Sequence, residues 1–167
     1  DTFLTLRDIA DKDYSLSERI EESQKIAGQY GYFNVQISKQ ADVMVLFFLL
    51  EDLFSPEIKK KNFYYYEKRC FHDSSLSLST HSILANDLGE KEQAYKLYTR
   101  ASMIDLGPKM NSSNPGIHAA SLGGIWQCTV FGFGGVRLYG DDLRIQPALP
   151  DNWSELKAPI YWKGQRL

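Results

Sequence analysis

The hydrophobic pattern of this chain changes its period once, at Gly134-Gly135, and this change constrains the fold more than any other feature. Before the two glycines, apolar residues recur at helical spacing over long stretches. After them, short segments rich in β-branched and aromatic residues are separated by turn residues. The sequence therefore predicts a mainly α-helical chain of about five helices, followed by the first strands of a β-rich element.

The longest apolar stretch runs from Ile37 to Phe54, and its density predicts a helix that is buried on most of its circumference. The next helix is predicted to start at Ser55-Pro56-Glu57, because serine caps free N–H groups and proline is tolerated at the first helical position. It should run to about Glu67. Further helices are predicted, with approximate bounds, at 77–89, 90–104 and 117–133, while residues 1–34 are predicted to be mostly loop with at most one short helix near 15–27.

The C-terminal segments read as two β-hairpins. Val136–Tyr139 and Leu143–Ile145 flank a turn at Gly140, and Ile160–Trp162 is followed by Lys163-Gly164 and a short return segment. The chain stops as this return segment begins, and neither end resembles a domain boundary. We therefore expect a piece of a larger fold.

Charge and composition exclude several classes of protein. The chain of 167 residues has 19 basic and 21 acidic residues, a balance that argues against nucleic-acid binding. No apolar run approaches the roughly 20 residues of a membrane span. Its two cysteines, Cys70 and Cys128, do not form a disulfide framework, and two reduced thiols fit a cytoplasmic protein. The three histidines, at positions 72, 81 and 118, lack the spacing of a metal motif, so no metal site is predicted.

Three helix starts carry polar residues that could bind a ligand. Lys39-Gln40 precedes the most apolar helix, Ser74-Ser75 precedes the next serine-rich one, and His118 opens the last. Each has an ordinary structural interpretation: a lysine extending to water, serine N-caps, and a histidine satisfied in the core. Each also has a functional one, because hydroxyls and an imidazole beside free backbone N–H groups suit an anion.

Four motifs, in order and at compatible spacing, resemble glycoside hydrolase family 65, which includes the maltose, trehalose and kojibiose phosphorylases. They are Lys-Gln-Ala-Asp-Val at 39–43, His-Asp-Ser-Ser-Leu-Ser at 72–77, Gly-Ile-His-Ala-Ala-Ser-Leu-Gly-Gly at 116–124 and Phe-Gly-Phe-Gly-Gly-Val at 131–136. The resemblance covers the chain from about Ser38 to Trp153, and residues 1–30 match less distinctly.

The resemblance implies that residues 1–135 are the second half of an (α/α)6 catalytic barrel and that residues 136–167 begin a small β-rich C-terminal domain. Half of such a barrel would expose parts of Val43–Leu50 and Trp126–Phe133. The implied reaction is inverting cleavage of an α-linked glucose disaccharide with phosphate as co-substrate, giving β-glucose 1-phosphate. No cofactor is implied, and the full-length protein would be a homodimer. The general acid of the family is a glutamate upstream of the matched region, so this chain contains no catalytic residue and should be inactive alone.

By the same resemblance, Lys39 and Gln40 match residues that bind the glucosyl unit, while Ser74, Ser75 and His118 lie in loops that would bind phosphate. An inverting reaction needs a nucleophile on the face opposite the leaving oxygen. Where phosphate is that nucleophile, an anion pocket takes the place of a catalytic carboxylate. The alternatives are a trehalase-type α-glucoside hydrolase of the same family and a non-catalytic carbohydrate-binding or interaction module.

Overall fold

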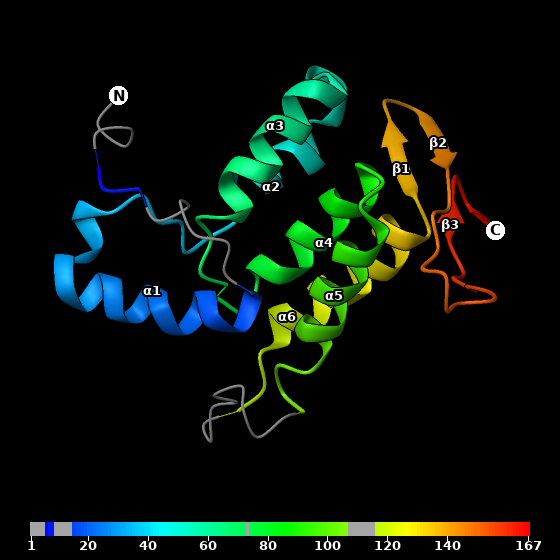
Figure 1. Cartoon of the computed structure of the whole chain (residues 1–167). Helices are drawn as coiled ribbons and strands as arrows, with labels where there is room; N and C mark the ends of the chain where they lie inside the picture. The colour runs from blue at the N-terminus through cyan, green and yellow to red at the C-terminus, as the bar shows by residue number, and fades with distance from the viewer. Residues whose placement is uncertain (1–5, 9–14, 73, 107–115) are drawn as a thin grey trace.

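The computed structural model describes residues 6–8, 15–72, 74–106 and 116–167. Within them, six α-helices come first and four short strands follow, so the predicted mainly helical fold with a C-terminal β element is confirmed. Figure 1 shows α4, α5 and α6 side by side in the middle of the molecule, with α1 toward one end and the strands at the other.

The helices are α1 (Leu16–Tyr30), α2 (Asp42–Leu49), α3 (Pro56–Glu67), α4 (Ser77–Asp87), α5 (Lys91–Ser102) and α6 (Ala119–Gln127). Two short 3-10 turns, η2 (Tyr32–Asn34) and η3 (Glu51–Leu53), follow α1 and α2, and α6 continues as a π-helical segment, η4 (Cys128–Phe133). The strands form two antiparallel hairpins, β1 (Val136–Tyr139) with β2 (Asp142–Ile145) and β3 (Tyr161–Trp162) with β4 (Gln165–Arg166).

The prediction of one long helix over residues 37–54 is wrong. Ser38 is extended, because its N–H donates to the carbonyl of Arg69 at 2.9 Å and its carbonyl accepts from the N–H of Phe71 at 3.1 Å. Because Ser38 pairs with a neighbouring segment, the helix begins only at Asp42, and α2 ends at Leu49 with Leu50 as its C-cap.

The predicted burial of this helix on most of its circumference is also wrong. Met44 and Phe47 are buried, but Leu46 and Leu49 are 41% and 67% exposed. Among the described elements, α3, α4 and the turn η3 contact α2, and they cover one side of it. Trp126 on α6 is likewise 57% exposed. The exposure expected for parts of residues 43–50 and 126–133 is therefore confirmed.

Helix α4 is the centre of the core. Nine of its eleven residues are buried, and α5 packs along it. Two of its polar side chains donate to neighbouring backbone: Ser82 to the carbonyl of Ala94 at 2.8 Å and Asn86 to that of Gly132 at 3.1 Å. None of the described helices combines the length and the apolar character needed to cross a membrane. The large side chains of the core cluster include Met44, Phe47, Phe63, Leu78, Leu84, Leu97, Ile104 and Phe133.

Helices α4 and α6 run in the same direction and approach closely. A methyl group on Gly124 would lie 2.5 Å from Oγ of Ser79, and one turn later the thiol of Cys128 donates to the carbonyl of Ser79 at 3.0 Å. Further along both helices, Gly132 faces Ile83. This order of contacts means that α4 and α6 begin at the same end of the bundle, as Figure 1 also shows.

The first β-hairpin is fastened to the helices at two points. Gly135 has a φ of +63°, and a Cβ there would lie 1.8 Å from the carbonyl oxygen of Gln146, so only glycine fits. The Arg137 guanidinium donates to Glu51 at 3.0 Å and makes two hydrogen bonds with Asp87 at 2.8 and 2.9 Å. The strands are thereby held against the turn after α2 and the end of α4.

Candidate functional site

The first candidate segment, Lys39-Gln40, lies in the turn between the extended residue Ser38 and helix α2. The hydroxyl of Ser38 donates to the carbonyl of Gln40 at 2.5 Å, which fixes this turn. The side chains of both Lys39 and Gln40 are exposed. The turn therefore presents a cationic and an amide side chain to solvent at the start of α2.

The second candidate segment meets the first directly. The hydroxyl of Ser74 donates to Oε1 of Gln40 at 3.0 Å, although the two residues are 34 positions apart in the sequence. The same hydroxyl accepts from the N–H of Leu76 at 3.3 Å, just before α4 begins. Ser75 is half-buried beside it. Asp73 of the same motif lies outside the described residues. The two candidate segments are therefore in direct contact through Gln40 and Ser74.

The contact between these segments follows from the backbone pairing beneath it. Ser38 and Cys70 form a parallel bridge, so the chain leading into α2 and the chain leading toward α4 lie side by side. His72 has a φ of +53°, a value that is uncommon outside glycine and turns the chain toward α4. The two loops are consequently held together by main-chain hydrogen bonds as well as by the Gln40–Ser74 pair.

His118 is positioned by a carboxylate. Its backbone N–H donates to Oδ2 of Asp105 at 2.9 Å, and its Nδ1 lies 2.6 Å from Oδ1 of the same residue. Hydrogen bonds from the His118 side chain and backbone lower the pKa of Asp105. Because Nδ1 is engaged, Nε2 is the ring nitrogen left to meet a ligand.

His118 shares one end of the bundle with the serines but does not join their hydrogen bond. It is the N-cap residue of α6, while Ser74 and Ser75 precede α4, and these parallel helices begin at the same end. The hydrogen bonds of its backbone N–H and of its ring both go to Asp105. The five predicted residues thus fall into two groups: Gln40 and Ser74 in contact, with Lys39 and Ser75 adjacent to them, and His118 at the next helix start.

A pocket lies beside this site. Its volume is about 260 Å³, and its lining includes Ser38, Gln40, Tyr65 and His81. Among the predicted residues, Gln40 is the one that lines it. The pocket connects the exposed Gln40 with a buried polar cluster behind it.

That cluster consists of Glu67, Cys70, His72 and His81, and the sequence patterns did not predict it. Oε2 of Glu67 lies 3.2 Å from Nε2 of His72 and also contacts Nδ1 of His81. The thiol sulfur of Cys70 lies 3.7 Å from Nδ1 of His72. The only hint in the sequence was the pair Cys70-x-His72; Glu67 and His81 come from two different helices.

The ionisable groups of the cluster stabilise one another's charged forms. Burial would raise the pKa of Glu67, but the two imidazoles hold it well below its ordinary value. Burial would lower the pKa of His81, but the Glu67 carboxylate raises it to about 9. Burial also works against a Cys70 thiolate, yet the two histidines lower the pKa of that thiol to about 6. By contrast, burial raises the pKa of the Cys128 thiol to about 12.

Known proteins match both parts of the chain. The model of the glycosyl hydrolase family 65 central catalytic domain matches residues 1–127, and that of the family 65 C-terminal domain matches residues 136–167. A kojibiose phosphorylase of Halothermothrix orenii is 47% identical over 132 residues, which are 79% of this chain and 17% of the relative. An α,α-trehalose phosphorylase of Thermoanaerobacter brockii is 38% identical over 166 residues, 94% of this chain and 21% of the relative.

A solved structure shows the same likeness in three dimensions. It comes from the human microbiome and is assigned as a kojibiose phosphorylase. It superimposes with a TM-score of 0.84 at 31% sequence identity, covering 99% of this chain and 23% of the other. This chain therefore spans about a fifth of the length of the curated relatives it matches.

Proposed function

The chain belongs to glycosyl hydrolase family 65, and from this premise we propose that it forms part of an enzyme that cleaves an α-linked glucose disaccharide by phosphorolysis, with inversion, to β-glucose 1-phosphate. The names of its relatives, a kojibiose and a trehalose phosphorylase, support phosphate as the acceptor and such a disaccharide as the substrate.

The observation that carries this proposal is the contact between Gln40 and Ser74. In an inverting phosphorolysis, an oxygen of phosphate attacks the anomeric carbon directly, so the residues that bind glucose and those that bind phosphate must adjoin each other. Gln40, proposed for the glucosyl unit, and Ser74, proposed for phosphate, lie within one hydrogen bond. Their pairing supports a single site with two neighbouring subsites.

We assign each predicted residue one role. Lys39 and Gln40 bind hydroxyl groups of the glucosyl unit. Ser75 donates a hydrogen bond to phosphate, and Ser74 does so when its hydroxyl proton turns from Oε1 of Gln40 to the anion. His118 donates from Nε2 while Asp105 holds Nδ1. Hydrogen bonds to a charged acceptor are about twice as strong as those between neutral groups, which suits hydroxyl and imidazole donors to an anion.

We extend the proposal to the rest of the protein on the same resemblance. Residues 1–135 belong to the (α/α)6 barrel and residues 136–167 begin the β-rich domain. The general-acid glutamate lies upstream, so the 167-residue chain alone does not turn over substrate. The absence of a cofactor, a homodimeric full-length protein and a cytoplasmic location stay predictions.

The test measures β-glucose 1-phosphate formed by the full-length protein from kojibiose and from trehalose, with and without phosphate. We expect turnover that depends on phosphate. His118→Ala should raise the KM for phosphate more than the KM for the disaccharide, whereas Lys39→Ala should have the opposite preference. The two variants serve as each other's control, because each removes a side chain from a different subsite.

Three results would contradict the proposal. Release of free glucose without phosphate would identify a hydrolase, and binding of a disaccharide without turnover would identify a carbohydrate-binding module. An unchanged KM for phosphate in His118→Ala would remove His118 from the phosphate site and leave it as a partner of Asp105 alone.

A further inference from the structure

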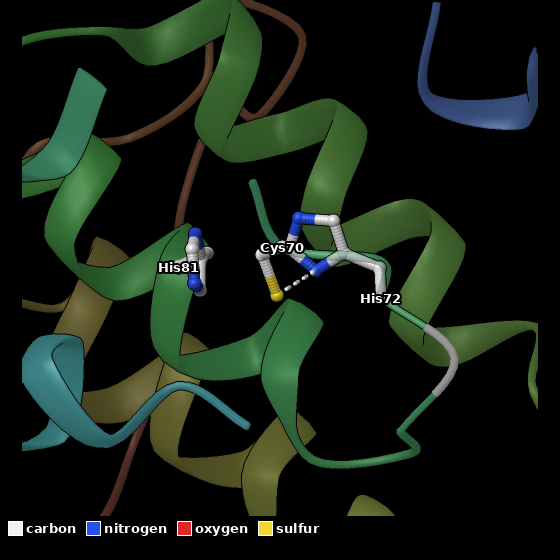
Figure 2. Close-up of side chains that lie close together, drawn as sticks. All are labelled: Cys70, His72 and His81. Carbon is white, nitrogen blue, oxygen red and sulfur yellow. Dashed lines mark hydrogen bonds between the residues drawn. The ribbon is translucent and has the colours of Figure 1, made fainter. Parts of the chain in front are cut away.

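A sulfur and two imidazole nitrogens converge in the interior of the chain. Cys70 and His72 lie on the segment between α3 and α4, and His81 projects from α4 (Figure 2). Their ligand atoms all lie within 4.8 Å of one another, and none of the three side chains is more than 1% exposed. Figure 2 shows the Cys70 sulfur between the two rings, toward the His72 side.

Glu67 holds both rings in one orientation. Its Oε2 contacts Nε2 of His72 and Nδ1 of His81, and its other oxygen accepts from Nε2 of Gln93 at 3.2 Å. The ring nitrogens that Glu67 does not engage are therefore Nδ1 of His72 and Nε2 of His81. Nδ1 of His72 lies 3.1 Å from the hydroxyl of Ser77, a contact that a bound ion would replace. A histidine that binds a metal commonly donates its second N–H to a carboxylate, which fixes its tautomer and raises its basicity.

One dimension of the cluster is close to that of a tetrahedral site, and the three ligand atoms, which lie within 4.8 Å of one another, would draw together around an ion. With Zn–S near 2.3 Å and Zn–N near 2.0–2.1 Å, two ligand atoms in a tetrahedral site lie about 3.5 Å apart. The distance from the Cys70 sulfur to Nδ1 of His72 is 3.7 Å. Thiolate and imidazole are the ligands that zinc prefers, whereas magnesium and calcium take oxygen ligands.

Charge balance is compatible with a divalent cation at the same place. A buried Cys70 thiolate and a buried Glu67 carboxylate together carry two negative charges, which must be compensated because uncompensated buried charge is expensive. Two imidazolium protons can supply the compensation, and so can one divalent ion bound by neutral imidazoles. In the second case the displaced protons pass to solvent.

The site also has an entrance. His81 lines the pocket of about 260 Å³ that it shares with Ser38, Gln40 and Tyr65. An ion can reach the cluster from this pocket, and the pocket can supply a water molecule as a fourth ligand to complete the tetrahedron.

From this geometry we propose that Cys70, His72 and His81 bind a zinc ion, with Glu67 orienting the two histidines from the opposite side. The ion ties the segment before Ser74 and Ser75 to helix α4. This proposal concerns residues outside the substrate-binding assignments, and it stands whether the reaction is a phosphorolysis or a hydrolysis.

The experiment titrates the chelator-treated 167-residue chain with Co²⁺ near neutral pH. We expect one Co²⁺ per chain, with near-ultraviolet absorption from thiolate-to-cobalt charge transfer, which Zn²⁺ then displaces. Cys128→Ser is the matched control, since the chain has two cysteines and Cys128 contacts the carbonyl of Ser79 instead of the cluster. The absorption should persist in Cys128→Ser, which assigns it to Cys70 even if a Cys70 variant fails to fold.

Two further variants sharpen the result. Cys70→Ser, checked for folding by circular dichroism, should lose the charge-transfer absorption. Glu67→Gln should keep it but bind the metal about 10–100-fold more weakly, as for other carboxylates that orient metal-binding histidines. A folded wild-type chain that binds neither Co²⁺ nor Zn²⁺ stoichiometrically would overturn the proposal. So would charge-transfer absorption that disappears in Cys128→Ser or persists in a folded Cys70→Ser.

Discussion

Replacing Gly124 by alanine should destabilise the chain, while the same replacement at the adjacent Gly123 should stabilise it. Both glycines lie inside α6, where alanine is favoured over glycine by about 1 kcal/mol through helix propensity alone. A methyl group at Gly123 meets nothing within 4 Å, so we expect that full gain there.

At Gly124 the added methyl group would lie 2.5 Å from Oγ and 3.0 Å from Cβ of Ser79. Overpacking of this kind costs about 1–3 kcal/mol. If the hydroxyl rotates away, it loses its hydrogen bond to the carbonyl of Leu76, 3.0 Å away, at about 1 kcal/mol. After the gain in helix propensity is subtracted, Gly124→Ala should lower the free energy of unfolding by about 1–3 kcal/mol.

Urea denaturation of the two variants, followed by far-ultraviolet circular dichroism, measures this difference directly. We expect the free energies of unfolding of Gly123→Ala and Gly124→Ala to differ by about 2–4 kcal/mol. Adding Ser79→Ala to Gly124→Ala should recover part of the loss, because the closest contact is removed. Equal stability of the two glycine variants would refute the close packing of α6 on α4.

Three other changes test separate contacts. Gly135→Ala should lower the free energy of unfolding by about 2–5 kcal/mol, because a methyl group there would overlap the Gln146 carbonyl. Gly140→Ala is the control and should cost about 1 kcal/mol, since Gly140 has a φ of +57° with open space around it. Equal losses in thermal unfolding would argue against the close approach at Gly135. Arg137→Met removes the ion-pair partner of Glu51 and Asp87 and should lower the free energy of unfolding, measured by urea denaturation, by about 2–4 kcal/mol. Lys91→Met breaks an exposed pair with Asp151 and should change it by less than about 1 kcal/mol. His118→Leu should raise the pKa of Asp105 toward 3.8, as measured by NMR of the carboxyl group. Because the pKa of Asp105 is lowered in the folded state, its contribution to stability is present above pH 3.8 and is lost as the pH falls below that value. An unchanged pKa of Asp105 in the variant would show that His118 does not lower it.

Apart from the start of α2, the helix starts and the first hairpin could be predicted from the sequence because their signals are local. Ser55 caps α3 through a hydrogen bond to the N–H of Ile58, as its position before Pro56 indicates. The prediction of one buried helix over residues 37–54 was wrong, because the hydrophobicity of a segment shows that it can be buried but does not show which neighbours cover it. The pairing of Ser38 with Arg69 and Phe71 is likewise a non-local contact that no periodicity reveals.

In the candidate site, too, local signals were predictable from the sequence and non-local contacts were not. Residue type and position at a helix start singled out Gln40, Ser74 and His118, and the structure places the first two in contact. The cluster around Glu67 and His81 escaped prediction, because these residues come from α3 and α4 and share no motif spacing. Asp105 was missed for the same reason, since only the fold brings it to His118.

The π-helical segment η4 makes this stretch of chain intolerant of changes in length. Its wider turns present the carbonyls of Phe131 and Gly132 sideways, where Arg137 and Asn86 donate to them. Deleting one residue from Cys128–Phe133 would tighten the winding toward an ordinary helix, in which each carbonyl accepts from the N–H four residues later and points along the helix axis. Both acceptors would then turn away from their donors. We therefore expect insertions and deletions among functional homologues to collect in the surface turns and to spare these six residues.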